Sequence, residues 1–147
     1  MAAIRQETDP QRRPSIVPQL PYQDIAAALA FLERAFGFRE IPTARRVSAA
    51  GVIGHSLVEF GDSVIGIGTQ GAHHAVSPKS GGGESQYLSV YINEIKTHYE
   101  RARAAGAEIA SELRPHVAGR THRVYEALDP EGHRWRFVQF MPEVPQG

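Results

Sequence analysis

The sequence contains no cysteine among its 147 residues. This absence excludes disulfide bonds, zinc–thiolate sites and thiol nucleophiles, and it fits a reducing compartment. The sequence also lacks any apolar run close to the ~20 residues that a membrane-spanning helix needs. Its polar start, MAAIRQETDPQRRP, has no apolar centre of the kind found in signal peptides. We therefore expect a cytoplasmic protein.

An excess of charge of either sign is absent as well. Sixteen Lys and Arg balance sixteen Asp and Glu, which gives a formal net charge of +0. No general attraction to phosphate backbones or anionic lipids is expected, so nucleic acids and membranes are poor partners. The 41% of hydrophobic and 22% of charged residues are instead typical of one soluble globular domain.

Composition divides the chain into two tails and two similar modules. Residues 1–14 are polar and charged, cannot support a core and are expected to form a flexible tail. The expected domain covers residues 15–140, with modules at 15–70 and 84–140 and a short tail at 141–147. The Gly-, Ser- and His-rich segment TQGAHHAVSPKSGGGE, which has no periodicity, predicts a connecting loop.

In the first module the pattern predicts a strand, a helix and a hairpin. The segment IVPQLPY is apolar with two prolines, which favours a short or edge strand. Asp24 is placed to cap a helix, and Gly37 to end it. Apolar residues between them recur at spacings of four, three and four: Ile25, Leu29, Leu32 and Phe36. The segments VIGHSLVEF and SVIGIG flank Gly61-Asp62, a link typical of a tight hairpin.

The second module repeats this order at an offset of about 70 residues. YLSVYI predicts a strand, Asn93 a helix cap and Gly106 the helix end, with a further strand near Ile109. The arms RVYEAL and HRWRFVQF flank Asp129-Pro130-Glu131-Gly132, which suits a type I turn. One module alone is too small to bury much apolar surface, so a pair is expected.

Four segments in this order resemble the vicinal oxygen chelate superfamily, which includes glyoxalase I, bleomycin-resistance proteins, fosfomycin-resistance enzymes and extradiol dioxygenases. They are DIAAALAFLERAFGF, HSLVEFGDSVIGIG, INEIKTHYERARAAGAEI and DPEGHRWRF. The combination of GDSVI with DPEGHRW looks most like the PhnB-like branch. The resemblance implies an α+β fold with two tandem βαβββ modules, whose strands form a curved, cup-like mixed sheet with helices on the outer face.

In the metalloenzymes of that superfamily, His and Glu side chains at four strand positions hold a divalent cation in the cup. Aligned through the local motifs, these positions fall on Val17, Gly66, Tyr87 and Arg136. An aliphatic group, a missing side chain, a neutral phenol and a fixed cation are unsuited to Mg²⁺, Mn²⁺, Fe²⁺ or Ni²⁺. We therefore expect no metal and no other cofactor.

Strand alternation predicts the lining of the cup instead. The expected ligand-binding residues are Gln19, His55, Glu59, Tyr87, Tyr91, Tyr125 and Arg136, around a floor kept open by Gly66 and Gly68. Tyrosine faces and a guanidinium suit an aromatic or anionic organic ligand. Ordinary sheet packing of the tyrosines, and an ion pair of Arg136 with Glu59 or Glu126, are the structural alternatives.

Three functions remain open on these residues. The first is a metal-independent binding protein, like the bleomycin-resistance members that sequester a small molecule in grooves at a homodimer interface. The second is a metal-independent isomerase or lyase in which His55 beside Glu59, or a tyrosine, transfers a proton. The third is a metal-dependent lyase or dioxygenase whose ligands the alignment misplaces. The missing ligands favour the first.

Overall fold

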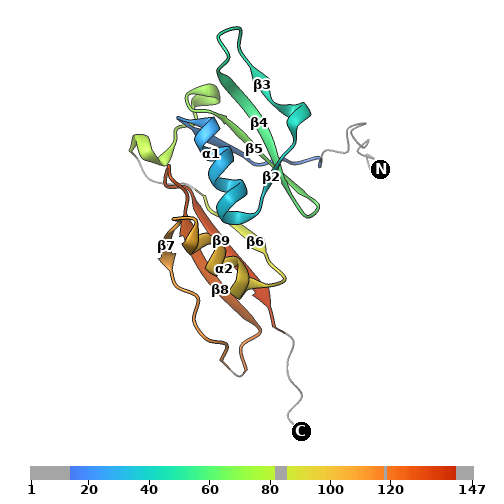
Figure 1. Ribbon diagram of the computed structural model, residues 1–147, viewed down its shortest axis with the longest axis vertical. Coiled ribbons are helices and arrows are strands. Elements are labelled where there is room, and N and C mark those ends of the chain that lie inside the picture. Colours follow the sequence, from blue (N-terminus) through green and yellow to red (C-terminus); the bar gives the residue numbers. More distant parts are fainter. Residues whose placement is uncertain (1–13, 82–85, 118, 142–147) are drawn as a thin grey trace, which may run out of the picture.

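The computed structural model describes residues 14–81, 86–117 and 119–141 (Figure 1). Except for Pro14 and Met141, the two expected tails lie outside these residues. The first module contains β1 (Gln19–Tyr22), α1 (Ile25–Phe31), η1 (Leu32–Phe36), β2 (Arg39–Glu40), η2 (Pro42–Ala44), β3 (Arg46–Val47), β4 (Ile53–Phe60) and β5 (Ser63–Thr69). The turns η3 (Ala72–His74) and η4 (Pro78–Ser80) follow in the connecting segment. The second module contains β6 (Leu88–Tyr91), α2 (Ile95–Ala104), β7 (Glu108–Ser111), β8 (His122–Leu128) and β9 (Arg134–Phe140).

The two modules have the same topology. The first sheet has the strand order β1-β5-β4-β2, with β3 also paired to β4, and the second has the order β6-β9-β8-β7. In each sheet the first strand of the module runs parallel to the last, and the other pairs are antiparallel. The expected fold of two tandem βαβββ modules is therefore confirmed. No helix in the described ranges is both long and apolar enough to cross a membrane.

Local sequence explains the first helix. The Asp24 carboxylate accepts a hydrogen bond from the Ala27 amide at 3.0 Å, which satisfies a free donor at the helix start. The chain continues through the wider turn of η1 and stops at Gly37, whose φ of 77° lies in the left-handed region. The predicted cap, apolar stripe and end of this helix are confirmed.

The second helix is capped differently from the prediction. Asn93 does not cap it; the N-cap residue is Glu94, which makes no side-chain capping bond. The carboxamide of Gln139 on β9 instead accepts a hydrogen bond from the Ile95 amide at 3.0 Å and donates to the Asn93 carbonyl oxygen. A neighbouring strand therefore supplies the capping group, which residues close in sequence could not reveal.

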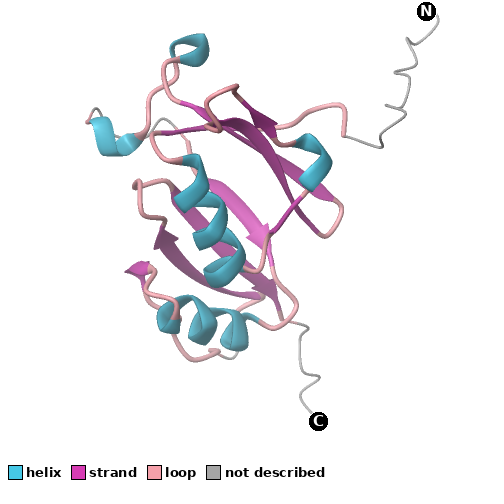
Figure 2. Cartoon of the chain, turned by 45° about the horizontal axis from the view of Figure 1, so that its top comes forward, coloured by secondary structure: helices cyan, strands magenta, loops and turns pink. Residues whose placement is uncertain are grey.

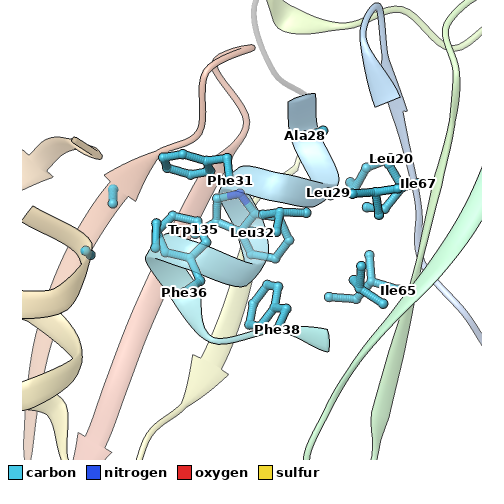
Figure 3. Close-up of a cluster of buried hydrophobic side chains, with 14 of the residues drawn as sticks. Leu20, Ala28, Leu29, Phe31, Leu32, Phe36, Phe38, Ile65, Ile67 and Trp135 are labelled. Atoms are coloured by element: carbon cyan, nitrogen blue, oxygen red, sulfur yellow. The ribbon is translucent and has the colours of Figure 1, made fainter. Parts of the chain in front are cut away.

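The two modules share one hydrophobic core. Figures 1 and 2 both place α1 between the first sheet and α2. Phe36 at the end of η1 is fully buried, with its ring centroid 4.8 Å from that of Phe137 and 5.8 Å from that of Trp135. In Figure 3, Trp135 of the second module lies beside Phe36 and Phe38 of the first. Neither sheet buries its helix-covered face without the other module.

The loop between β8 and β9 also joins the modules, through two buried carboxylates. Asp129 accepts hydrogen bonds from the Tyr22 hydroxyl and from Trp135 Nε1. Glu131 accepts from the amides of Gln23 and Asp24, at 2.6 and 2.9 Å, and from the Ser77 hydroxyl at 2.6 Å. The turn residues of the DPEG segment therefore hold the start of the first helix.

Candidate functional site

The open face of the first sheet, opposite the helices, contains a large cavity. Phe60 pairs with Ser63 across the predicted Gly61-Asp62 turn, so alternate residues of β4 and β5 lie on this face. They border a cavity of about 1120 Å³ between β1, the β2–β3 segment, β4 and β5. Its lining includes Val17, Gln19, Arg46, His55, Gly68 and Thr69. A cavity of this size admits a drug-sized molecule.

A hydrogen bond from His55 to Gln19 crosses the floor of this cavity. Gln19 pairs with Gly66, and His55 pairs with Gly68, so the two side chains belong to the strands on either side of β5. His55 Nε2 lies 2.9 Å from Gln19 Oε1, and its N–H donates to that oxygen. A Cβ at position 66 would overlap the Gln19 carboxamide. The glycine is therefore required for this carboxamide to lie across β5.

Positive charge gathers around the cavity. Arg45 is paired with Glu40, with Nη2 at 2.5 Å from Oε1, and the same carboxylate accepts from the Ser56 hydroxyl. The hydrogen bond from Arg45 keeps the pKa of Glu40 below its usual range. Arg46 lies beside His55 across the β3–β4 pair and forms no ion pair or hydrogen bond with any residue in the described ranges. Burial, with a smaller effect of the Arg46 charge, lowers the pKa of His55.

The predicted pair of His55 and Glu59 does not form. The two residues share a face of β4 but are four residues apart, a separation of roughly 13 Å along a strand. Glu59 accepts hydrogen bonds from Arg39 at 2.7 and 3.0 Å instead. Burial and the Arg46 charge lower the pKa of His55, whereas a neighbouring carboxylate would have raised it.

The open face of the second sheet carries bulky side chains. Tyr87, Tyr91 and Phe140 are 58%, 62% and 64% exposed, and the last two rings stack at a centroid distance of 5.4 Å. Arg136 lies between Ser89 and Glu126 in the sheet, but Glu126 bonds to Arg134 at 3.0 Å. Within the described ranges the Arg136 guanidinium has no hydrogen-bond or ion-pair partner, so neither ion pair considered above forms.

Tyr125 was predicted on the open face, and this placement is wrong. It pairs with Phe137 and is fully buried on the helix-covered face. Its hydroxyl donates to His98 Nδ1, and burial raises the pKa of the phenol. The reason is the five-residue connection from Leu128 to Arg134, which shifts the alternation of β8 by one residue relative to the prediction.

The structure therefore brings together only part of the predicted set. Gln19 and His55 line the large cavity, whereas Glu59, Tyr87 and Arg136 do not. Tyr91 borders a second cavity of about 400 Å³, beside Phe60, Val64 and Leu88. The prediction missed Arg46, Thr69 and His73 in the large cavity. His73 has a φ of 54° and His74 one of 65°, an unusual pair of left-handed residues beside the site.

The donor set does not fit the divalent metal that the resemblance implies. Val17 and Gly66 offer no lone pair, and the carboxamide of Gln19 occupies the space where a side chain at position 66 would begin. Tyr87 and Arg136 offer a phenol and a cation. No group of three or more His, Cys, Asp or Glu in the described ranges is arranged to hold a metal ion.

Comparison with known families matches residues 15–137 to the Glyoxalase/Bleomycin resistance protein/Dioxygenase superfamily. The chain belongs to this superfamily. Among solved structures, TioX from Micromonospora sp. ML1 is 31% identical, with a TM-score of 0.70 over 86% of this chain and 98% of TioX. A structure of the fosfomycin resistance protein FosX from Listeria monocytogenes, complexed with manganese(II) and sulfate, is 19% identical, with a TM-score of 0.61 over 87% of this chain and 90% of FosX.

One sequence relative matches most of this chain, but its name gives no activity. An uncharacterized protein of Mycobacterium tuberculosis (strain ATCC 25618 / H37Rv) is 27% identical over 136 residues, which cover 89% of this chain and 77% of that protein. The FosX likeness supports the superfamily fold alone, because its identity is low. The predicted superfamily is confirmed, whereas the finer assignment to the PhnB-like branch stays a prediction.

Proposed function

We propose that this chain is a metal-independent member of the superfamily that binds a small aromatic or anionic organic molecule, in the manner of a resistance or sequestration protein. One observation carries the proposal: Gln19 and its hydrogen bond to His55 occupy the floor above Gly66, where a metalloenzyme would place a ligand side chain. The cavity of about 1120 Å³ above them supplies the binding volume.

The separation of His55 from Glu59 favours a binding function over a catalytic one. The cavity lining contains His55 but no carboxylate beside it, and Glu59 is paired with Arg39 outside the cavity. Proton transfer by His55 acting together with Glu59 would need both groups within hydrogen-bond reach of one substrate. The isomerase or lyase alternative therefore has no supporting pair.

The proposal includes a homodimer. The aromatic side chains of Tyr87, Tyr91 and Phe140 form an exposed apolar strip on the open face of the second sheet. A second copy of the chain that covers this strip would remove it from water and also enclose a ligand. Light scattering at micromolar concentration should give twice the chain mass of 16.1 kDa; a mass equal to one chain would contradict this part of the proposal.

A fluorescent probe tests the binding site. The neutral aromatic N-phenylnaphthylamine should bind to the purified protein, and Gly68→Phe, which fills the cavity floor, should weaken binding about tenfold or more. A Cβ at position 68 makes only an ordinary contact with His55, so a side chain can begin there without overlap, and thermal unfolding checks that the variant is folded. Ser111→Phe on exposed β7 adds the same ring elsewhere and should leave affinity within about twofold.

Elemental analysis tests the other half of the proposal. Protein purified without chelator should contain less than about a tenth of an equivalent of transition metal, as expected for a donor set without carboxylate or imidazole convergence. Stoichiometric metal, or probe binding that is unchanged by Gly68→Phe, would overturn the proposed function.

A further inference from the structure

From the distribution of charge around the large cavity, we infer that the ligand is an organic anion with an apolar body, and that Arg46 on β3 binds its oxyanion. The inference rests on the proposed function, since it assigns the ligand class of the same cavity. It moves the anion-binding role from Arg136, which the sequence favours, to a residue of the other module.

Strand pairing fixes the place of Arg46. It is the partner of His55 in the antiparallel β3–β4 pair, and directly paired residues project from the same face of a sheet. His55 points into the large cavity, and Arg46 lines it too. Arg136 lines neither this cavity nor the one of about 400 Å³.

The charge balance of the lining then selects Arg46. The ionisable lining residues are Arg45, Arg46, His55 and His73, and no carboxylate is among them. Glu40 neutralises Arg45 through two hydrogen bonds of 2.8 and 2.5 Å. His55 donates its Nε2–H to Gln19, and its lowered pKa keeps the ring neutral at pH 7. Arg46 is therefore the permanent charge that no described carboxylate compensates.

The rest of the lining defines the body of the ligand. Val17, Pro21, Ile41 and Leu57 contribute aliphatic surface to the lining of the same cavity. Apolar walls with one charged group suit a ligand in which a ring system carries a single carboxylate, sulfonate or phosphonate. A planar guanidinium can donate two parallel N–H bonds to two oxygens of such a group, a fixed geometry that an ammonium lacks.

The test compares two probes that differ by one anionic group. Anilinonaphthalene sulfonate and N-phenylnaphthylamine share the same rings, and only the first carries a sulfonate. The measured quantity is the ratio of their dissociation constants. In Arg46→Gln we expect the preference for the sulfonate to fall about tenfold, the size of one charge-assisted hydrogen bond, with little change for the neutral probe.

Two variants serve as controls. Arg103→Gln removes the same charge from exposed α2, where the side chain packs over Tyr99, and should leave the ratio unchanged. Arg46→Lys keeps the charge but loses the planar fork, and should give an intermediate ratio. Thermal unfolding of each variant shows that the fold is retained, which matters because anilinonaphthalene sulfonate also binds partly folded protein.

The outcomes separate the inference from the proposed function. If both probes bind in a Gly68-dependent manner but Arg46→Gln leaves their ratio unchanged, the assignment of Arg46 is wrong and the binding function stands. If Arg136→Gln abolishes the preference and Arg46→Gln does not, the oxyanion lies in the second module. If neither probe binds in the cavity of the unchanged protein, the proposed function itself fails.

Discussion

The open faces of the two modules differ far more than their helix-covered faces. Adding 70 to the residue numbers of the Gln19–Gly66 pair in the first sheet gives the Ser89–Arg136 pair in the second, so the two parallel pairs are equivalent. The first face has a glycine floor and a large cavity, whereas the second has a guanidinium and exposed aromatic rings. Strands with equivalent pairing therefore carry different open faces: the first borders a large cavity, and the second is covered by bulky side chains.

This difference indicates which residues the fold requires and which can vary between the two modules. The helix-covered faces of both sheets contribute to one shared core, and Leu20, Ile67, Trp135 and Phe137 are each almost fully buried. Changes there alter packing in both modules. Open-face residues such as His55, Gly66 and Arg136 lie outside this core cluster, so they can differ between modules at little cost to stability.

The largest predicted effect concerns the shared core. Phe36→Ala removes a fully buried ring that packs against Phe31, Phe38 and Trp135, and should lower the free energy of unfolding by about 3–5 kcal/mol. Chemical denaturation provides the measurement. Ile16→Ala, at a side chain 85% exposed, is the control and should cost less than about 0.5 kcal/mol. Equal losses would contradict the idea of a single shared core.

The next effect concerns the connection between the modules. Glu131→Ala leaves the amides of Gln23 and Asp24 and the Ser77 hydroxyl without their acceptor, and should destabilise the protein by about 2–4 kcal/mol. In the control, Glu126→Ala removes a carboxylate that is paired with Arg134 on the open face, and should cost less than about 1 kcal/mol. If the control were as damaging as Glu131→Ala, the buried carboxylate would have no special role in joining the modules.

A smaller effect should appear in the pH dependence of stability. His98 on α2 donates from Nε2 to the Phe36 carbonyl oxygen at 2.8 Å and accepts from Tyr125 at Nδ1, so it contacts both modules. Burial, with a minor contribution from the Arg101 charge, lowers its pKa in the folded state. Below pH 6.5 the unfolded chain therefore binds more protons than the folded one, and stability falls as the pH falls.

The variant His98→Gln isolates this contribution. It removes the titrating ring while it retains hydrogen-bonding groups, so the slope of unfolding free energy against pH between about 5 and 6.5 should become shallower. His55→Gln serves as the comparison on the open face, where burial is less complete and a smaller change in slope is expected. An unchanged slope in His98→Gln would show that other groups cause the pH dependence.

Much of the fold was predictable because its signals are local. The Gly61-Asp62 turn sets the register of β4 and β5, and the apolar stripe from Ile25 to Phe36 predicts the first helix and its buried side. Each of these signals depends on residues within a few positions of one another.

The errors and omissions concern residues whose placement depends on segments that are distant in the sequence. The place of Tyr125 depends on the exact length of the connection to β9, where one residue reverses the face. Arg46 lies in a segment without periodicity, and only its pairing with β4 brings it beside His55. Asp129 and Glu131 were predicted as turn residues, but their buried contacts with Tyr22, Gln23 and Asp24 join positions more than a hundred residues apart.

The smallest predicted effect lies within the cavity floor itself, where two glycines of β5 can be compared directly. Neither has a positive φ, so alanine is compatible with the backbone at both positions. In Gly66→Ala the new methyl group displaces the Gln19 carboxamide and breaks its bond to His55, whereas in Gly68→Ala it meets His55 Cδ2 at an ordinary 3.5 Å. Denaturation should find Gly66→Ala less stable than Gly68→Ala by about 1 kcal/mol.

A double-mutant cycle shows whether the carboxamide causes this difference. In a Gln19→Ala background the carboxamide that overlaps position 66 is removed, so Gly66→Ala should lose its penalty and behave like Gly68→Ala, since each replaces a glycine in a strand by alanine. A coupling energy near zero between positions 19 and 66 would mean that the glycine is not needed to accommodate Gln19. The glycine at position 66 on the cavity floor would then need an explanation other than the position of the Gln19 carboxamide across β5.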